Sequence, residues 1–326
     1  MATKKLFITG GAGFIGYFLC EKLLSLGHEP IVFDAFLNYA NPCENHYQRY
    51  LEYRLKKLSN RARVIRGDIR DRGFVLNALE ETKPDLVIHL AAVPLAKASN
   101  QFSEEAIQVN LNGTISLLES IRRVDCVQGL IYTSTSFIYG DFAYEPADEK
   151  HPAEPLGLYG GSKLAGEVLV KAFSRRFGKS YTIVRPSGVY GPTDSNGRVS
   201  ETLVESAIRG MPLTVHNSGT DRIDFTYVKD TAHGLALAAL SDKARNETFN
   251  ITRGEGRSIQ EFADVLRKMF PDLQISHAPS TERRPNRGAL DIKKAREYLG
   301  YSPSYSLEDG IHEYVDFILS NGFMRR

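Results

Sequence analysis

Short apolar runs alternate with amphipathic stretches along the first 185 residues. Apolar runs of strand length lie at residues 4–9, 30–33, 63–65, 85–92, 129–133 and 181–184. Stretches with helical character separate them, at residues 17–26, 44–58, 74–79, 104–123 and 164–177. Strands that alternate with helices are typical of a parallel sheet with right-handed crossovers and helices on both faces. The pattern therefore predicts an α/β fold with a doubly wound parallel sheet.

The pattern changes at about residue 186, where proline and glycine become frequent and the expected elements become shorter. We interpret residues 1–185 as a Rossmann-type cofactor-binding domain and residues 186–326 as a smaller C-terminal substrate-binding lobe. No repeat or low-complexity linker separates them, so we expect them to pack as one unit. Some C-terminal segments are expected to return to the sheet.

The first strand runs into a glycine cluster, Gly10-Gly11-Ala12-Gly13-Phe14-Ile15-Gly16, and then into the first helix. Without Cβ atoms, its glycines allow a pyrophosphate to approach the backbone N–H groups at the positive end of that helix. The second strand ends in Asp34, 18 residues after Gly16, close to where a dinucleotide-binding fold places its acceptor for the ribose 2′-hydroxyl. Asp34 would repel a 2′-phosphate, and no arginine follows within a few positions. The sequence thus predicts NAD rather than NADP.

Composition argues against several classes of protein. The 326 residues have a net charge of +2, with 42% hydrophobic and 25% charged residues, so there is no basic excess for nucleic acid. Three widely spaced cysteines predict neither a disulfide framework nor a metal site. No apolar run approaches the length of a membrane span. We therefore expect a cytoplasmic protein without a metal and without a nucleic-acid or membrane partner.

A tyrosine and a lysine lie four residues apart in Tyr159-Gly160-Gly161-Ser162-Lys163, a spacing that places both on one helix face. The spacing alone is not specific, because Tyr53 and Lys57 repeat it in a polar helix where a solvated face is the simpler interpretation. Tyr159, however, lies one crossover after the strand that ends in the hydroxyl cluster Thr133–Ser136. Ligands of parallel sheets bind beyond such strand ends.

These residue types suit base catalysis. A free phenol has a pKa of about 10, and a nearby ammonium and an oxidised nicotinamide would both lower it. Tyr159 would then be the base, and Thr135 would hold the substrate oxygen between the phenol and the nicotinamide. Lys163 would also hold the nicotinamide ribose.

With these motifs the chain resembles the extended short-chain dehydrogenases/reductases, and among them the NAD-dependent sugar-nucleotide epimerase/dehydratase family. The resemblance is carried by the glycine turn with Asp34 and by residues 67–70, 89–92, 133–140, 159–163, 185–192, 224–230 and 307–310. It implies the catalytic triad Thr135, Tyr159 and Lys163. It also implies a set of cofactor contacts: Gly10, Gly13, Phe14, Ile15, Gly16, Asp34, Asp68, Ile69, Leu90, Ala91, Ala92, Tyr159, Lys163 and Ser187. Finally, it implies a homodimer in which the helices that start near Glu104 and Gly157 pair with their copies.

Members of this family differ in the step that follows the first oxidation. The 4,6-dehydratases carry an Asp-Glu pair directly after the threonine, and the uronate decarboxylases carry a glutamate at the second of these positions. Here the two positions are Ser136 and Phe137, so elimination of water and decarboxylation are both disfavoured. The resemblance implies a nucleotide-sugar 4-epimerase that acts by C4 oxidation, rotation of the ketosugar and re-reduction. A net NAD-dependent oxidoreductase and a non-catalytic nucleotide-sensing protein remain as alternatives.

Two departures from the family's pattern concern the substrate. Many relatives have an asparagine where this chain has Gly188, and an arginine where it has Ile223, with Arg222 one position earlier. We expect the nucleotide sugar to be contacted by a wider set of residues: Lys97, Thr135, Ser136, Gly188, Arg222, Arg283 and Arg284. A solvated surface charge is the alternative for each basic residue. The loop after Asp34 and the next helix most resemble those of uronate 4-epimerases, so a UDP-hexose or a UDP-hexuronate is expected.

Three other residues are interpreted as structural. His89 ends a buried strand and is expected to pack, or to bond to the backbone, rather than to ligate a metal. Asp230 is positioned to cap the helix that runs through residues 235–240. Cys20 is expected to face the core from the first helix.

Overall fold

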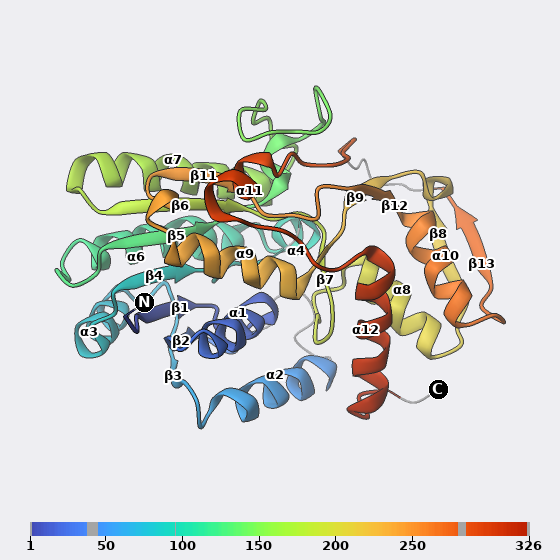
Figure 1. Cartoon of the computed structure of the whole chain (residues 1–326), viewed down its shortest axis with the longest axis horizontal. Coiled ribbons are helices and arrows are strands. Elements are labelled where there is room, and N and C mark those ends of the chain that lie inside the picture. Colours follow the sequence, from blue (N-terminus) through green and yellow to red (C-terminus); the bar gives the residue numbers. More distant parts are fainter. Residues whose placement is uncertain (1, 38–44, 95, 280–284, 325–326) are drawn as a thin grey trace.

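A single parallel sheet organises the first half of the chain (Figure 1). The computed structural model describes residues 2–37, 45–94, 96–279 and 285–324, in which seven strands pair in the order β11-β6-β5-β4-β1-β2-β3. All their pairings are parallel. The strands are β1 (Lys5–Thr9), β2 (Glu29–Asp34), β3 (Arg63–Arg66), β4 (Leu86–His89), β5 (Gly129–Thr133), β6 (Ser180–Arg185) and β11 (Glu247–Asn250). The strand order reverses beside β1, as in doubly wound sheets, so the predicted fold class is confirmed.

Both faces of the central strands β1, β4 and β5 are buried, which explains why these strands are largely apolar. In β1, Leu6 and Ile8 pack on one face and Phe7 packs on the other, and all three are fully buried. The first face is covered by α1 (Phe14–Ser25), α9 (Val228–Leu240) and α11 (Lys293–Leu299). The second face is covered by α3 (Arg72–Thr82), α6 (Gly113–Ile121) and α7 (Leu158–Phe177).

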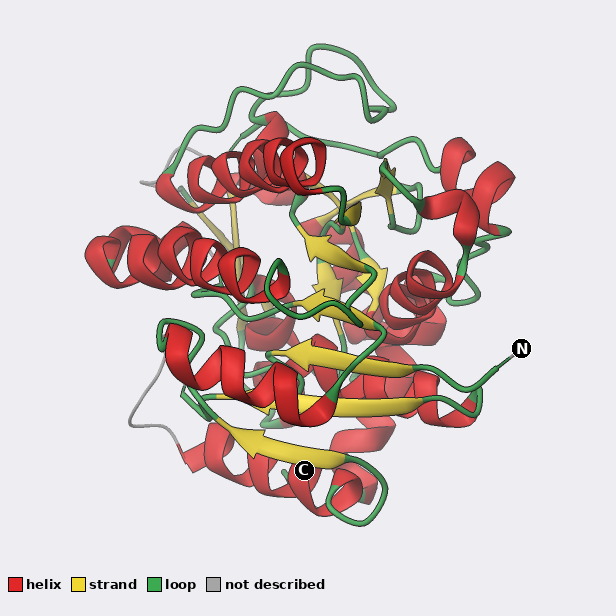
Figure 2. Ribbon diagram, turned by 90° about the vertical axis from the view of Figure 1, so that its left-hand side faces the viewer, coloured by secondary structure: helices red, strands yellow, loops and turns green. Residues whose placement is uncertain are grey.

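A second hydrophobic core is formed by elements that lie to the right of the sheet in Figure 1, and Figure 2 shows the strands of the sheet between layers of helices. This core is formed mainly by α8 (Val199–Ile208), α10 (Ile259–Met269) and α12 (Leu307–Ser320), and α2 (Asn45–Leu58) contributes Tyr50. Short strands complete this region: β7 (Val189–Tyr190), β8 (Leu213–His216), β9 (Arg222–Asp224), β10 (Thr226–Tyr227), β12 (Gly256–Ser258) and β13 (Ile275–Ala278). Two later segments return to the sheet, because β11 pairs with β6 and α9 packs against α1.

The region predicted as one helix over residues 104–123 is broken. It consists of α5 (Ser103–Ile107), a π-helical segment (Gln108–Asn112) and α6, and the short α4 (Ala96–Gln101) precedes it. The buried side chain of Asn110 accepts a hydrogen bond from the Val93 N–H at 2.7 Å and donates to Ser162 Oγ at 3.2 Å. These bonds tie the π-helical segment to the loop after β4 and to α7, and such bulges are frequent at functional sites.

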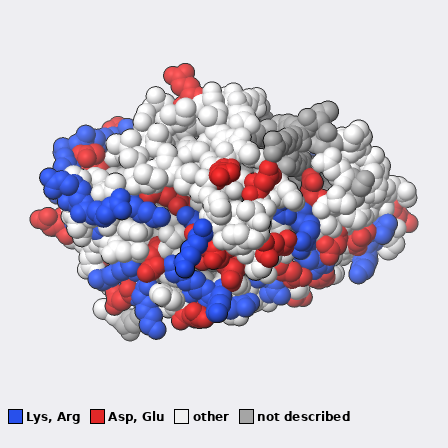
Figure 3. Space-filling model, turned by 90° about the horizontal axis from the view of Figure 1, so that it is seen from above, with Lys and Arg blue, Asp and Glu red and all other residues white. Residues whose placement is uncertain are grey.

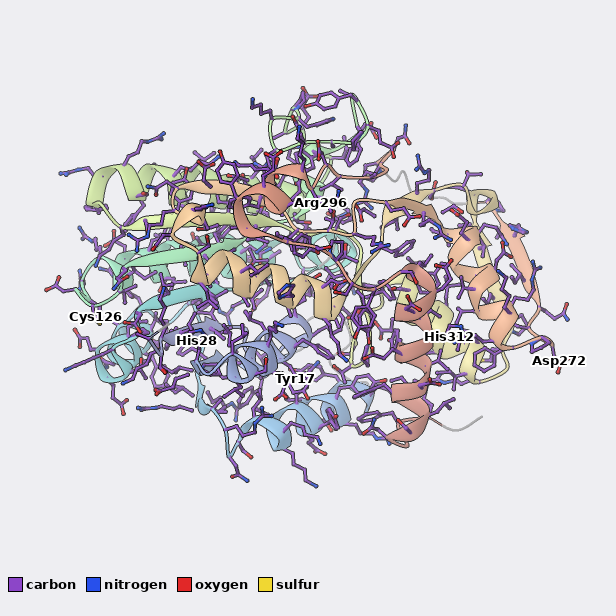
Figure 4. All side chains as sticks on the ribbon, in the orientation of Figure 1. Tyr17, His28, Cys126, Asp272, Arg296 and His312 are labelled. Atoms are coloured by element: carbon purple, nitrogen blue, oxygen red, sulfur yellow. The ribbon has the colours of Figure 1, made fainter. Side chains whose placement is uncertain are left out.

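Two structural predictions have different outcomes. The prediction that Asp230 caps a helix is wrong, because Asp230 lies within the first turn of α9 and accepts hydrogen bonds from the N–H groups of Ser304 and Tyr305 at 2.8 and 3.0 Å. It therefore fixes the loop before α12. Cys20 is fully buried, as predicted. The exposed Cys126 lies at the end of the sheet remote from the second core (Figure 4).

The surface carries charges of both signs. Figure 3 shows Lys and Arg interspersed with Asp and Glu on one face, beside an area of uncharged residues. Among the helices that the structure describes, each is too short or too polar to cross a bilayer.

Candidate active site

A cavity of about 970 Å³ lies where the parallel strands end and the second core begins. Residues that directly follow β1, β2, β4, β5 and β6 line one side of it, and residues of the loops around 195–200 and 221–225 line the other. Most of the predicted site residues line this one cavity: Gly10, Gly13, Phe14, Ile15, Gly16, Asp34, Asp68, Ile69, Leu90, Ala91, Ala92, Thr135, Ser136, Tyr159, Lys163, Ser187, Gly188 and Arg222. Arg283 and Arg284 lie outside the described residues. Lys97 belongs to α4, and its side chain lies outside the described part of the structure.

The glycine turn packs too tightly for larger residues. Gly10 has a φ of +71°, and a Cβ there would lie 2.7 Å from the backbone nitrogen of Ala91. A Cβ on Gly16 would lie 2.2 Å from the carbonyl oxygen of Gly10. Gly13 is the N-cap residue of α1 and brings the start of that helix to the cavity. The turn thus presents the helix N-terminus to the cavity at close backbone range, which is the arrangement that binds phosphates.

Asp34 is fixed at the end of β2 by two backbone groups. Its carboxylate accepts hydrogen bonds from the N–H groups of Ala12 at 3.0 Å and Phe36 at 2.8 Å. Burial raises the pKa of this carboxyl group, and the two N–H groups and the nearby Arg54 oppose that shift. Asp34 therefore links the glycine turn to the second strand and still lines the cavity.

Thr135, Tyr159 and Lys163 come from two neighbouring elements. Thr135 follows β5 and caps a short 3₁₀ turn, accepting a hydrogen bond from the Phe137 N–H at 3.3 Å. Tyr159 lies in the first turn of α7 and is hydrogen-bonded to Thr135. Lys163, one helical turn further, donates from Nζ to the carbonyl of Thr133 at 2.9 Å. The three side chains are thus held together by β5 and α7.

The pKa shifts of Tyr159 and Lys163 differ from those expected from the sequence, where a neighbouring ammonium was to lower the pKa of the phenol. Burial raises the pKa of Tyr159 in the chain itself, although Arg198 and the hydrogen bond with Thr135 act in the opposite direction. Burial also lowers the pKa of Lys163 to about 8, against the effect of Glu167. The ammonium of Lys163 is directed to a backbone carbonyl, and the cation that acts on the phenol is that of Arg198.

The residues predicted to contact the substrate have distinct surroundings. Ser136 donates to the hydroxyl of Ser187 at 3.0 Å. Gly188 has a φ of +49°, and a Cβ there would lie 2.5 Å from the carbonyl oxygen of Asp224, so the asparagine of many relatives would not fit this backbone. Arg222 forms an ion pair with Glu145 at 2.9 Å and is 46% exposed at the rim of the cavity.

Sequence reasoning missed three arginines that line the cavity. Arg198 precedes α8 and pairs with the buried Asp194. Arg54 is buried in α2 and donates to the carbonyl of Thr193 at 2.9 Å. Arg287 lies in the segment before α11. No local motif marks them: Arg54 and Arg287 contact distant parts of the chain, and Arg198 is held by Asp194 within an irregular loop.

His89 is buried between two hydroxyl groups. Its ring nitrogens lie 2.7 Å from Thr9 Oγ1 and 3.0 Å from Thr114 Oγ1. Burial lowers its pKa to about 3, so the ring is neutral. It packs as expected, but it bonds to side chains rather than to the backbone. The described residues contain no group of three or more His, Cys, Asp or Glu arranged to hold a metal ion.

Comparison with known proteins agrees with this geometry. The model of the NAD dependent epimerase/dehydratase family matches residues 6–252. A "Putative UDP-glucose 4-epimerase" of Methanocaldococcus jannaschii is 32% identical, over 97% of this chain and 99% of its own length. UDP-glucuronic acid decarboxylase 6 of Arabidopsis thaliana is 30% identical, over 95% of this chain and 87% of its own length. The crystal structure of UDP-glucuronic acid 4-epimerase from Bacillus cereus with UDP-glucuronic acid and NAD is 30% identical, with a TM-score of 0.87 over 96% of this chain and 98% of that one.

The family model spans the glycine turn, the Thr135 region and the Tyr159–Lys163 helix. The relatives are similar over nearly their whole length, so the likeness is not confined to a cofactor-binding half. The protein is an enzyme, and its cofactor is NAD. The resemblance found in the sequence is confirmed: the chain belongs to the NAD-dependent epimerase/dehydratase family.

Proposed function

We propose that this enzyme epimerises a nucleotide-linked hexose or hexuronate at C4. One observation carries the proposal: Thr135, Tyr159 and Lys163 line the same cavity as the glycine turn, and neither residue after Thr135 carries a carboxylate. The names of similar proteins, a UDP-glucose 4-epimerase and a UDP-glucuronic acid 4-epimerase, support a UDP-linked sugar as the substrate.

The chain's own residues fit NAD. The start of α1, which the tightly packed glycine turn brings to the cavity, would hold the pyrophosphate on its backbone N–H groups. Asp34, oriented by two backbone N–H groups, would accept the ribose hydroxyl. The bound cofactor would supply the acceptor for the C4 hydride and the source of its return.

Tyr159 would take the proton of the C4 hydroxyl while Thr135 holds the same oxygen. Because burial raises the pKa of the phenol, the base needs positive charge beside it. Arg198 supplies part of that charge in the chain itself, and the oxidised nicotinamide ring adds to it. Lys163, anchored on the Thr133 carbonyl, would hold the nicotinamide ribose.

No further acid or base is required after the oxidation. Ser136 is hydrogen-bonded to Ser187, and the ring of Phe137 packs against Tyr159, so neither position can supply the carboxylate expected of a dehydratase or decarboxylase. Rotation of the ketosugar within the cavity presents its other face for re-reduction. Tyr159 then returns the proton to the C4 oxygen.

We further propose that residues 1–185 hold the cofactor, that residues 186–326 hold most of the substrate, and that two copies form a homodimer through α5, α6 and α7. Exposed apolar side chains on these helices support the interface: Ile107 and Ile115 are 41% exposed, and Val168 is 57% exposed. Burial of such residues would favour association.

The test of the reaction is product analysis by NMR with UDP-glucose and UDP-glucuronic acid deuterated at C4. We expect the label to remain at C4 of the epimerised product. Tyr159→Phe should lower turnover by about 10²–10⁴-fold, the usual effect of losing a general base, and leave NAD binding intact. Thr135→Ala should cost less, because Ser134 or Ser136 could partly replace the hydroxyl. Stoichiometric release of NADH, or a dehydrated or decarboxylated product, would refute the epimerase.

A further inference from the structure

Arg54 is a buried charge that the proposed reaction does not use. It lies in α2, is only 1% exposed, and borders the cavity. A guanidinium taken out of water needs hydrogen bonds or counter-charges in compensation. From Nη1, Arg54 donates to the carbonyl of Thr193 at 2.9 Å. Because α2 follows β2 and Thr193 lies in the loop between β7 and α8, this bond joins parts of the chain that are 139 residues apart.

The residue that Arg54 contacts has a strained backbone. Thr193 has a φ of +69°, in the left-handed region that a β-branched residue rarely adopts. Its hydroxyl is buried without a hydrogen-bond partner among the described residues, so the side chain does not hold this conformation through a polar contact. Such a backbone persists only where its surroundings impose it, and it is frequent at functional sites. Arg54 bonds to the carbonyl of Thr193 itself, so it directly restrains the strained peptide group.

The strained residue sets the course of the loop that follows it. Asp194 is fully buried and accepts a hydrogen bond from Arg198, four residues later. Arg198 lies over the ring of Phe14 at the start of α1, with its guanidinium carbon 5.6 Å from the ring centroid. Residues 195–200 line the cavity on the side opposite the strand ends. A rotation of the peptide group at Thr193 would therefore move Asp194 and displace Arg198 from the cavity.

We propose that Arg54 is a positioning residue: by holding Thr193 in its left-handed conformation, it keeps the loop at residues 193–198 in the shape that binds the nucleotide sugar. The proposal rests on the function proposed above for the identity of that ligand. Arg54 acts on the ligand through the loop and not by contact. Glycine adopts a left-handed φ without the steric penalty of a Cβ. Glycine at position 193 should therefore make the loop less dependent on Arg54.

The test measures the calorimetric Kd of UDP and of UDP-glucose on the NAD-loaded enzyme. Arg54→Met should weaken binding of both by about 5- to 100-fold, the shift in population expected when one strained residue relaxes. Arg54→Lys should lose less, because its ammonium can still donate to the carbonyl. Adding Thr193→Gly to Arg54→Met should recover part of the loss. A general structural role of Arg54 would not be repaired by glycine at position 193.

Hydrogen exchange gives a readout that requires no sugar nucleotide. The N–H of Gly197 donates to the buried carboxyl group of Glu201 at 2.8 Å, so its exchange reports on the conformation of the loop. This exchange should be faster in Arg54→Met and slower again when Thr193→Gly is added. Amides of the loop should change more than those of the sheet, which a general loss of stability would not produce.

Arg49 provides a matched control, because it lies in the same helix and donates to the carbonyls of Gly322 and Phe323 at 3.0 Å each. Arg49→Met removes a similar link between α2 and a distant part of the backbone, and it should leave UDP affinity and the exchange of Gly197 unchanged. Thermal unfolding checks that each variant is folded. If Arg54→Met does not fold, Arg54→Lys with and without Thr193→Gly carries the comparison.

Unchanged exchange at Gly197 in Arg54→Met would overturn the inference, as would a loss of UDP affinity that Thr193→Gly does not recover. A larger loss of affinity for NAD than for UDP would also overturn it, because Arg54 would then act as a cofactor contact. Failure of the wild-type protein to bind UDP and UDP-glucose would instead refute the proposed function. The exchange of Gly197 would still decide whether Arg54 positions the loop.

Discussion

Replacing Glu167 by glutamine should destabilise this protein far more than the same change in an exposed ion pair. Arg185 donates from Nε and Nη2 to the two carboxylate oxygens of Glu167 at 2.9 and 2.7 Å, and the two side chains are only 6% and 2% exposed. The same guanidinium also donates to the hydroxyl of Tyr139 and to the carbonyl of Glu149, each at 3.0 Å. The pair joins α7 to the end of β6. Glu167 lies one helical turn after Lys163 in α7.

The expected loss in the free energy of unfolding follows from the burial of this ion pair. An amide at position 167 would leave the charge of Arg185 buried without its main counter-charge, and breaking a buried pair costs about 3–5 kcal/mol. The carboxylate of Glu149 also acts on Arg185, so we expect a loss near the lower end, about 3 kcal/mol.

The chain contains a matched control. Arg61 donates to both oxygens of Glu21 at 2.7 and 2.9 Å, in a pair whose side chains are 46% and 31% exposed. Such surface pairs contribute about 0–1 kcal/mol, because water screens them. Glu21→Gln should therefore change the free energy of unfolding little, although its two contacts, both made by Arg61 Nη1, are as short as those of the buried pair.

Equilibrium unfolding in urea measures the difference, with the denaturant slope checked for each variant. Glu167→Gln should lower the midpoint clearly, and Glu21→Gln should leave it near that of the wild type. Replacing both members of the buried pair by apolar residues, Arg185→Met with Glu167→Leu, should recover part of the loss. A loss below about 1 kcal/mol for Glu167→Gln, equal to that of the control, would refute the reasoning.

Three further predictions concern the cofactor, the pH dependence and the assembly. NAD should bind more tightly than NADP in calorimetry, because Asp34 repels a 2′-phosphate; equal or tighter binding of NADP would contradict this. Since burial lowers the pKa of Lys163 to about 8, its cationic form is lost as the pH rises through that value, and kcat should decline there. Activity that stays constant up to about pH 10 would show that the charge of Lys163 is not required. Light scattering at micromolar concentration should give the mass of a dimer, and Val168→Glu should shift it towards a monomer; a monomeric wild type would exclude the proposed interface.

Six of the seven strands could be predicted from the sequence because each contains a short apolar run, whereas β11 (Glu247–Asn250) contains mostly polar residues and was not located. The limits of β5, for example, agree with the prediction at both ends. The hydrophobic pattern placed the start of α7 at residue 164, whereas the motif placed it near Gly157, and the helix begins at Leu158. A Cβ on Gly160 would lie 2.7 Å from the carbonyl oxygen of Phe137, so a tertiary contact requires glycine within a helix. Helix propensity depends on the local sequence alone, so it does not reveal this contact with Phe137.

The residues of the candidate site also fall into two groups, those identified from the sequence and those that only the structure reveals. Residues that directly follow strands were identified from the sequence, because parallel strands bring their carboxyl ends to one edge. Asp34 and Thr135 are of this kind, and both line the cavity. Arg198 and Arg287 follow no sheet strand and carry no motif. Arg198 lies over the ring of Phe14 and Arg287 over that of Phe137, and only the folded chain brings these residues together.

Contacts between residues far apart in the sequence also alter the charge around Asp34, and with it the physical reason for expecting NAD. The sequence suggested that no arginine offsets this carboxylate, but Arg54 in α2 is buried and acts electrostatically on it. The guanidinium of Arg54 donates to the carbonyl of Thr193 and is also attracted electrostatically by the carboxylate of Asp194. Asp194 is already paired with Arg198, so Arg54 is left to offset Asp34, and the four charges sum to zero. A 2′-phosphate would add about two negative charges at neutral pH. The preference for NAD thus rests on the place of Asp34 at the end of β2, where a 2′-phosphate would meet its carboxylate, and not on the absence of a neighbouring arginine.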